Sequence, residues 1–175
     1  NIIAKKIRNQ INKKVLCMKK KGQRPPHLAT ILVGNNSVSM TYVNNKIKDC
    51  ENVGFKSSFL HLPNTINEKK LIKIIKDLNK DTLLDGLIIQ LPLPKNINKE
   101  NIIIAIDPDK DVDGFHPLNI GKMTMGIKTF IPATPLGILT LLNYYKINTK
   151  GKHLVIIGRS RIVGMPISIF PIFKG

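Results

Sequence analysis

The first twenty residues carry apolar side chains along one face of a predicted helix. Apolar positions recur at steps of four and three, the spacing of an amphipathic helix, at Ile3, Ile7, Ile11, Val15 and Met18. Gly22 and the pair Pro25-Pro26 interrupt this pattern, so the helix is expected to end before them.

Strand-like and helix-like patterns then alternate as far as residue 106. Short apolar runs predict three strands, at 28–33, 55–62 and 85–91. Apolar residues at helical spacing predict three more helices, at 37–53, from 65 to 78 and at 98–106. Alternating helices and strands are typical of a parallel sheet with right-handed crossovers, so the chain is placed in the α/β class.

Polar residues at helix starts predict where three helices begin. Ser37 is the expected N-cap of the helix at 37–53, and Thr65 and Glu68 have the spacing of a capping box for the next helix. Further along, Thr134 is expected to cap a helix that has Pro135 in its first position.

The stretch 85–94 predicts a buried strand that ends where ligands bind. Pro92 and Pro94 cannot donate ladder hydrogen bonds, so the strand must give way to a loop after Gln90. In open α/β sheets, ligands lie outside the carboxyl ends of the strands. Gln90 is therefore a candidate site residue, although a glutamine that only closes the strand explains the pattern equally well.

Three residues of the helix at 37–53 lie together beside its apolar stripe. At 100° per residue, Ser39, Tyr42 and Lys46 share one flank of this helix, and Tyr42 and Lys46 are surface neighbours four residues apart. They could form an aromatic platform beside an amine at the mouth of a cleft. A half-buried tyrosine beside a solvated lysine is the simpler interpretation.

An acidic loop stands out at residues 107–114. Four carboxylates, Asp107, Asp109, Asp111 and Asp113, fall within seven positions of a chain whose net charge is +17. The segment lacks the twelfth-position glutamate of an EF-hand loop, so calcium binding is not expected. An acidic turn remains possible, and a single carboxylate that recognises an amino-substituted heterocycle is the more specific hypothesis.

A glycine-rich turn follows a predicted strand at 153–157. Gly158 and Gly164 would let the backbone approach a pyrophosphate, although Ser160 replaces the middle glycine of the usual dinucleotide fingerprint. Arg159 and Arg161 are two of the four arginines in the chain. Guanidinium groups hold a phosphate dianion bidentately, so this turn favours NADP over NAD.

The basic composition does not by itself identify a partner. Lysine supplies 24 of the 28 cationic residues, scattered among Asn and Ile residues as in A/T-rich coding sequences, which indicates a solvated surface rather than a nucleic-acid interface. A basic nucleic-acid-binding protein is therefore a distant alternative. No apolar run is long enough to span a membrane and no signal peptide is recognisable, so no membrane partner is expected.

The cysteines and histidines indicate neither a disulfide nor a metal site. Cys17 and Cys50 have no metal-like or redox-motif spacing, and this favours a reducing, cytoplasmic compartment. The four histidines fall in different segments without ligand-like spacing, so each is expected to be structural and no metal is assigned. They are His27, His61, His116 and His153.

Five segments occur in one order across nearly the whole chain: Ser39-x-x-Tyr42 with Lys46, then 85–94, 109–117, 132–137 and 158–166. Together they resemble the bifunctional methylenetetrahydrofolate dehydrogenase/cyclohydrolase family. The resemblance implies oxidation of 5,10-methylenetetrahydrofolate by NADP to the methenyl cation, and hydrolysis of that cation to 10-formyltetrahydrofolate. Ala133 stands where the family usually has cysteine, a change expected to be tolerated.

The resemblance also assigns roles to residues. Lys46 would be the general acid/base, Gln90 its hydrogen-bonding partner, and Asp113 the acceptor for the amino edge of the pterin. The implied substrate-binding residues are Ser39, Tyr42, Leu91, Pro92, Asp113 and Thr134, with the ring of Tyr42 stacked on the folate. The implied NADP-binding residues are Gly158, Arg159, Ser160, Arg161 and Gly164.

Two domains, the second of them incomplete, are expected from the same resemblance. Residues 1–131 would form a folate-binding, three-layer α/β catalytic domain, and residues 132–175 the linking helix and first βα unit of an incomplete Rossmann domain. Pro171 would interrupt the continuing helix, so the sequence is interpreted as a truncated member. Full-length members are expected to be homodimers. A member that has lost dehydrogenase activity, keeping only folate binding or cyclohydrolase chemistry, is the main alternative.

Overall fold

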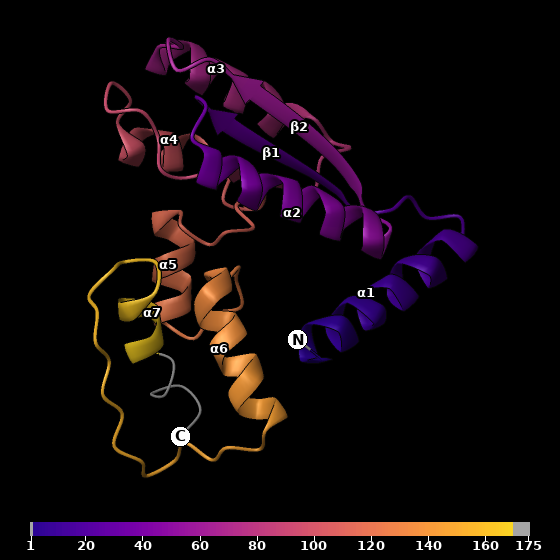
Figure 1. Ribbon diagram of the computed structural model, residues 1–175, viewed down its shortest axis with the longest axis vertical. Helices are drawn as coiled ribbons and strands as arrows, with labels where there is room; N and C mark the ends of the chain where they lie inside the picture. The colour runs from indigo at the N-terminus through magenta and orange to yellow at the C-terminus, as the bar shows by residue number, and fades with distance from the viewer. Residues whose placement is uncertain (1, 170–175) are drawn as a thin grey trace. The chain divides into compact units, whose positions relative to one another are not determined.

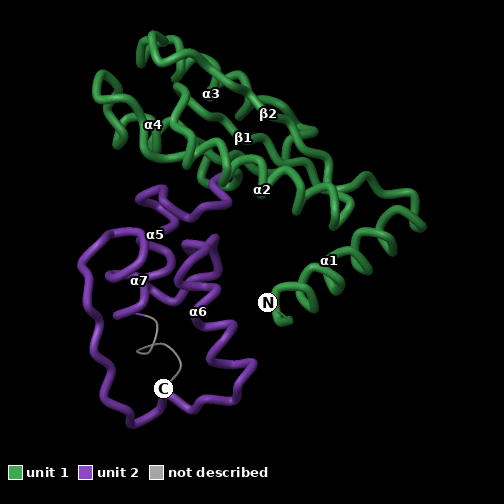
Figure 2. The backbone as a smooth tube through the Cα atoms, viewed as in Figure 1, with its two compact units in different colours: residues 1–110 green, residues 111–175 purple. Residues whose placement is uncertain are grey.

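The computed structural model describes residues 2–169, and its chain divides into two compact units (Figure 2). Unit 1 is Asn1–Lys110 and unit 2 is Asp111–Gly175. The predicted domain boundary after residue 131 stays a prediction, because compactness alone does not define a functional domain. Pro171 lies outside the described residues.

Unit 1 alternates helices and strands, as predicted. Its elements are α1 (Ile2–Lys20), β1 (His27–Val33), α2 (Ser37–Val53), β2 (Lys56–Leu62), α3 (Glu68–Lys80), β3 (Gly86–Ile89) and α4 (Lys99–Ala105). Each lies within two residues of its expected boundaries except the start of α3, which was expected three residues earlier. The α/β class is therefore confirmed.

The three strands of unit 1 form one parallel sheet in the order β2-β1-β3. Helix α2 packs on β1 and β2, while α3 and α4 contact each other on the opposite side of the sheet (Figure 1). Because side chains alternate along a strand, Ala29, Ile31 and Val33 share one face of β1, and all three belong to the main apolar cluster of the unit.

The burial of the strands explains why their sequences read as continuous apolar runs. All four residues of β3 are buried, as are six of the seven residues of β1. Both strands therefore face apolar layers on both sides. β2 lies at the edge of the sheet and exposes Phe59, which accounts for its mixed sequence.

Asparagine, rather than serine or threonine, caps the helices α2 and α3. Asn36 Oδ1 accepts a hydrogen bond from the Ser39 amide at 2.9 Å, and Asn67 Oδ1 accepts one from the Lys70 amide at 2.8 Å. The predictions that Ser37 and Thr65 are N-caps are therefore wrong. Asparagine caps helices as well as serine does, so the residue type alone does not decide between Asn36 and Ser37.

The predicted capping role of Thr134 is also wrong. Helix α6 (Ala133–Tyr144) begins two residues earlier than expected, after Pro132, which makes no side-chain cap. Thr134 and Pro135 therefore lie within the first turn, where helical amide groups have no intrahelical partner and proline is tolerated. Pro132 and Pro135 are both fully buried, and this packing fixes the start of the helix.

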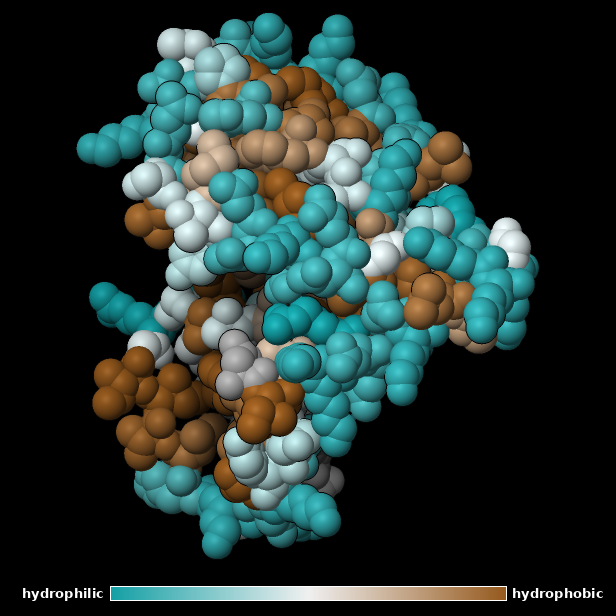
Figure 3. All heavy atoms as spheres, turned by 45° about the vertical axis from the view of Figure 1, so that its right-hand side comes forward, coloured by the Kyte–Doolittle hydropathy of each residue, from teal (hydrophilic) through white to brown (hydrophobic). Residues whose placement is uncertain are grey.

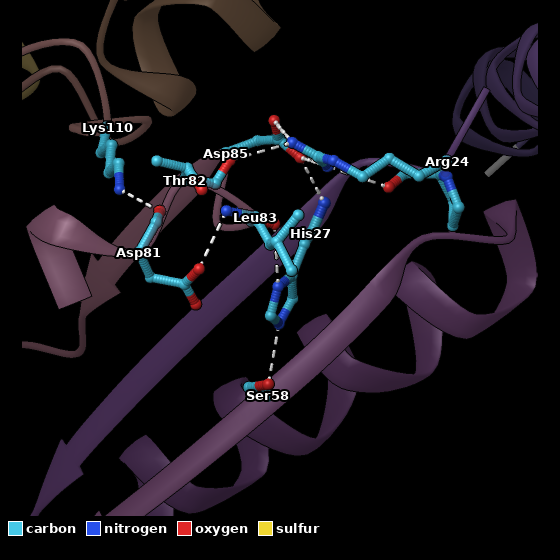
Figure 4. A network of polar contacts seen from close by, with 9 residues as sticks. Arg24, His27, Ser58, Asp81, Thr82, Leu83, Asp85 and Lys110 are labelled. Carbon is cyan, nitrogen blue, oxygen red and sulfur yellow. Dashed lines mark hydrogen bonds and ion pairs between the residues drawn. The ribbon is translucent and has the colours of Figure 1, made fainter.

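A polar network holds the entry to β3 against the entry to β1 (Figure 4). Arg24 donates to the Asp85 carboxylate through both terminal nitrogens, at 2.5 and 2.8 Å, and the His27 amide donates to the same carboxylate at 2.8 Å. The Arg24 guanidinium lowers the pKa of Asp85 and is itself held charged by the pair. The buried His27 ring contacts Leu83 O and Ser58 Oγ, as expected of a structural histidine.

The regular elements in the described part of unit 2 are all helices. Its helices are α5 (Pro117–Thr124), α6 and α7 (Gly164–Ile169). The predicted strand at 153–157 is wrong, because these residues form no regular structure and no other strand occurs in the described part of unit 2 to supply ladder hydrogen bonds. Val155 is 72% exposed and Ile157 is fully exposed.

Hydrophilic side chains cover much of the face seen in Figure 3, with apolar patches between them. Several of the exposed large apolar residues belong to unit 2, among them Leu136, Leu141, Tyr145, Leu154 and Val155. Among the described residues, no helix combines the length and the apolar character that a membrane crossing requires.

Candidate functional site

The amine and the amide singled out in the sequence meet at the carboxyl end of the sheet. Lys46 projects from the third turn of α2, and Gln90 directly follows the last residue of β3. The Lys46 ammonium donates to Gln90 Oε1 at 3.1 Å, and Lys46 is half-buried. The predicted contact between these side chains is therefore confirmed, and their catalytic roles stay predictions.

Neighbouring backbone groups fix the orientation of Gln90. Its amide nitrogen Nε2 donates to Leu91 O at 2.8 Å, and its backbone N–H donates to Ile31 O at 2.9 Å. Because Nε2 is held by this carbonyl, the side-chain oxygen faces Lys46. The pair thus has a defined polarity, with the amine as donor and the amide oxygen as acceptor.

The other predicted residues of unit 1 differ in their exposure. Tyr42 lies one turn before Lys46 and is 59% exposed, so its ring is accessible to a ligand. Ser39 is buried at 3% exposure, and its backbone is held by the Asn36 cap. Leu91 is half-buried and Pro92 is exposed, and the peptide between them is cis.

The acidic loop separates into carboxylates with different surroundings. Asp107 Oδ1 accepts the Asp109 amide at 2.9 Å and so closes a local turn. Lys110 lies between Asp109 and the buried Asp111 in the sequence. Its ammonium donates to three backbone carbonyls at the end of α3, including that of Asp81 at 2.6 Å (Figure 4). Lys110 is thus committed to capping α3, a role the sequence did not reveal.

Asp113 lies in a turn that Asp111 closes. The Gly114 amide donates to Asp111 O at 3.1 Å, which makes residues 111–114 a β-turn. Gly114 has a φ of +67°, and a Cβ on it would lie 2.8 to 2.9 Å from backbone atoms of residues 130–132. The Asp113 turn and the segment leading to Thr134 are therefore in close contact, and Thr134 is exposed between the buried prolines.

The glycine-rich turn has the close backbone approach that a dinucleotide site needs. A Cβ on Gly164 would lie 2.6 Å from Gly158 O, whereas a Cβ on Gly158 would meet open space. Arg159 and Arg161 are exposed. Ser160 Oγ accepts the amides of Val163 and Gly164 at 3.1 and 3.3 Å, so it organises the turn from within. These residues fit the phosphates of NADP.

The predicted site residues fall into both units. Unit 1 contains Ser39, Tyr42, Lys46, Gln90, Leu91 and Pro92, while unit 2 contains Asp113, Thr134 and the turn at 158–164. Within unit 1 the structure brings Lys46 to Gln90, and within unit 2 it brings the Asp113 turn to the segment before Thr134.

Comparison with known families gives matches in both parts of the chain. The model described as tetrahydrofolate dehydrogenase/cyclohydrolase, catalytic domain, matches residues 1–113. The model for the NAD(P)-binding domain of the same enzymes matches residues 132–172. These matches contain the Lys46–Gln90 pair and the glycine-rich turn, respectively.

Proteins named bifunctional protein FolD are similar to nearly the whole chain. The Flavobacterium johnsoniae protein is 55% identical over 169 residues, covering 97% of this chain and 57% of that protein. The Aquifex aeolicus protein is 51% identical over 173 residues, covering 98% and 60%. The chain therefore spans somewhat more than half the length of these relatives.

Solved structures of FolD enzymes have the same fold. The Campylobacter jejuni enzyme superposes with a TM-score of 0.96 at 43% identity, covering 99% of this chain and 62% of that one. The Trypanosoma brucei enzyme, solved with NADP cofactor and inhibitor, gives 0.93 at 29% identity, covering 99% and 59%. On these matches the chain belongs to the tetrahydrofolate dehydrogenase/cyclohydrolase family.

Proposed function

We propose that the protein of which this chain forms part or all interconverts one-carbon forms of tetrahydrofolate. The reactions are oxidation of 5,10-methylenetetrahydrofolate to the 5,10-methenyl cation and hydrolysis of that cation to 10-formyltetrahydrofolate. The observation that carries the proposal is the 3.1 Å hydrogen bond between Lys46 Nζ and Gln90 Oε1, at the sheet end where α/β proteins bind ligands.

Lys46 is the proton-handling group in this proposal. Hydrolysis of the methenyl cation adds water at the one-carbon unit and then breaks the bond from that carbon to one folate nitrogen. A nearby neutral amine can take a proton from the water and return one to the nitrogen that is released. Gln90 accepts a hydrogen bond from Lys46 and holds the amine in one place. The accessible ring of Tyr42, one helical turn away, offers a stacking surface for the aromatic part of the folate.

Asp113 and Thr134 supply polar recognition of the substrate. A carboxylate accepts hydrogen bonds from the amino group and ring N–H of a pterin, and the turn at 111–114 presents Asp113 in a fixed backbone geometry. Thr134 stands exposed at the start of α6, and the backbone contact at Gly114 adjoins its segment. Ser39, Leu91 and Pro92 complete the proposed substrate-binding set.

The turn at 158–164 is proposed to bind NADP. NADP, when bound, accepts the hydride removed from the methylene carbon. Gly158 leaves open space beside the backbone, Gly164 permits the close crossing, and Ser160 shapes the turn. Arg159 and Arg161 are placed to neutralise the phosphates, including a 2′-phosphate.

Replacement of Lys46 by methionine tests the proposal. We expect Lys46→Met to bind folate but not to hydrolyse methenyltetrahydrofolate, so that the absorbance of the methenyl compound persists, because only the proton-handling amine is removed. Lys48→Met, an exposed lysine two residues along the same helix, is the matched control and should turn over normally. Turnover by Lys46→Met at the rate of the control would remove Lys46 from its role.

A second candidate function is cyclohydrolase chemistry or folate binding without hydride transfer. It is favoured by the location of the Lys46–Gln90 pair and Tyr42 within unit 1, and by the absence of a strand before the glycine-rich turn in the described residues. Loss of supplied methenyltetrahydrofolate, without its NADP-dependent formation from the methylene compound, would support this candidate.

We also propose that the protein acts in the cytoplasm as a homodimer. Cys17 and Cys50 are both free thiols, as expected in a reducing compartment. A measured solution mass of twice the mass of the polypeptide would support the dimer, and a mass equal to the polypeptide would refute it.

A further inference from the structure

Three polar residues of unit 2 are linked beside the Asp113 turn. Asp111 and Asn119 are 1% and 2% exposed, and Asn119 Nδ2 donates to Asp111 Oδ2 at 2.9 Å. Asn119 Oδ1 accepts a hydrogen bond from Thr129 Oγ1 at 2.6 Å. We call Asp111, Asn119 and Thr129 the buried triad. Asp111 and Asn119 are too buried to contact a substrate, and Thr129 is half-buried.

The triad joins three segments of the chain. Asp111 closes the turn that carries Asp113, and its carboxylate also accepts the His116 amide at 2.7 Å just before α5. Asn119 lies in the first turn of α5. Thr129 immediately precedes residues 130–132, whose backbone contacts Gly114. The triad therefore ties the Asp113 turn, the start of α5 and the segment that leads to Thr134.

We propose that the buried triad is a positioning device for folate recognition, holding the Asp113 turn at a fixed place beside the segment that carries Thr134. This inference rests on the proposed folate site. Buried polar groups are costly when unsatisfied, so a fully connected chain of hydrogen bonds favours one geometry over its alternatives. Asp113 and Thr134 themselves contact the substrate in this scheme, whereas the triad acts through them.

The Thr129 hydroxyl is the part of the triad that can be removed with least change in shape. Thr129→Val keeps the volume of the side chain and removes the donor to Asn119 Oδ1, whereas Thr129→Ser keeps the donor. Thr124→Val is the matched control, because Thr124 is exposed on α5 and, among the described residues, its hydroxyl donates only to Ile120 O in the same helix. A general loss of packing or helix stability would affect the control and the serine variant as well.

The experiment measures KM and kcat for methenyltetrahydrofolate hydrolysis in the full-length protein, together with the unfolding midpoint. Thr129→Val should raise KM about five- to tenfold with kcat little changed, as expected when a binding group is misplaced by the loss of one supporting hydrogen bond. Thr129→Ser should restore KM to within about twofold of the wild type, and Thr124→Val should not change it.

The outcomes separate the inference from the proposed function. If the wild-type protein hydrolyses methenyltetrahydrofolate but Thr129→Val has the wild-type KM, the positioning role is wrong and the function stands. A raised KM that Thr129→Ser does not restore would also contradict it. If the wild type neither binds nor hydrolyses the substrate, the proposed function itself fails.

Discussion

Gly114→Ala should destabilise unit 2 far more than the same change at another glycine with positive φ. At Gly114 φ is +67°, and an added Cβ would lie 2.8 Å from Ile131 C, 2.9 Å from Phe130 O and 2.9 Å from Pro132 N. At Gly151 φ is +71°, but nothing lies within 4 Å of the added Cβ. Comparing the two variants therefore separates the free-energy cost of the left-handed backbone conformation from the cost of the steric clash.

The expected magnitudes follow from these two terms. A left-handed conformation costs an alanine about 1–2 kcal/mol, and the stiffer unfolded chain offsets about 0.4–1 kcal/mol of this. Gly151→Ala should thus lower the free energy of unfolding by no more than about 1.5 kcal/mol. At Gly114 the backbone of residues 130–132 must also move, which adds about 1–3 kcal/mol as in overpacked cores.

Urea unfolding followed by far-ultraviolet circular dichroism measures both variants. With a typical slope of about 1–3 kcal/mol per molar urea, the midpoint of Gly114→Ala should fall about 1 M below that of Gly151→Ala. Equal midpoints would refute the close contact between the Asp113 turn and residues 130–132. Because this contact lies beside Asp113, Gly114→Ala should also weaken folate binding, and Gly151→Ala should not.

Two further predictions concern titratable groups. The Arg24 guanidinium lowers the pKa of Asp85, so the charged carboxylate stabilises unit 1 above its ordinary pKa of about 4, and this contribution is lost as the pH falls through the lower folded-state pKa. Asp85→Asn should therefore lower the urea midpoint of unfolding at pH 7 and have a smaller effect near pH 2. Asp77→Asn, at an exposed residue, is the control. An equal effect of Asp85→Asn at both pH values would contradict the ion pair. Burial raises the pKa of the Cys50 thiol. Iodoacetamide at neutral pH should therefore label the exposed Cys17 first and Cys50 only after unfolding, as measured by peptide mass spectrometry. Equal labelling rates of the two cysteines in the native protein would contradict this.

The sheet of unit 1 could be predicted because its strands are buried on both faces. Residues of β1 and β3 such as Ile31, Leu87 and Ile89 form apolar runs that only a covered parallel sheet explains. The capping residues could not be predicted as well. Asn36 and Ser37 are adjacent residues with equal capping ability, and the residue type alone does not decide between them.

The segment at 153–157 shows the opposite situation. Its apolar pattern is typical of a strand, but a strand exists only where a neighbour accepts and donates its ladder hydrogen bonds. The described residues of unit 2 offer no such neighbour, and Ile157 is fully exposed. A pattern that depends on a distant partner therefore predicts the potential for a strand rather than the strand itself.

The candidate site combined predictable and unpredictable contacts. The Lys46–Gln90 contact joins residues 44 positions apart and was predicted through family resemblance, not from periodicity. The Asn119–Thr129 hydrogen bond joins a helix to a loop ten residues later, and no pattern of residue types marks it. Likewise, only the structure shows that Asp111 is buried while Asp113, in the same acidic run, is half-buried.

We expect Lys46 and Gln90 to act as one unit in methenyltetrahydrofolate hydrolysis. A double-mutant cycle with Lys46→Met, Gln90→Met and the combined variant measures the coupling between the two side chains. We expect each single change to reduce kcat strongly and the combined change to be no worse than Lys46→Met alone, since groups that act together are non-additive. Independent effects that multiply in the combined variant, or a Gln90→Met variant with wild-type kcat, would show that the two side chains do not act together.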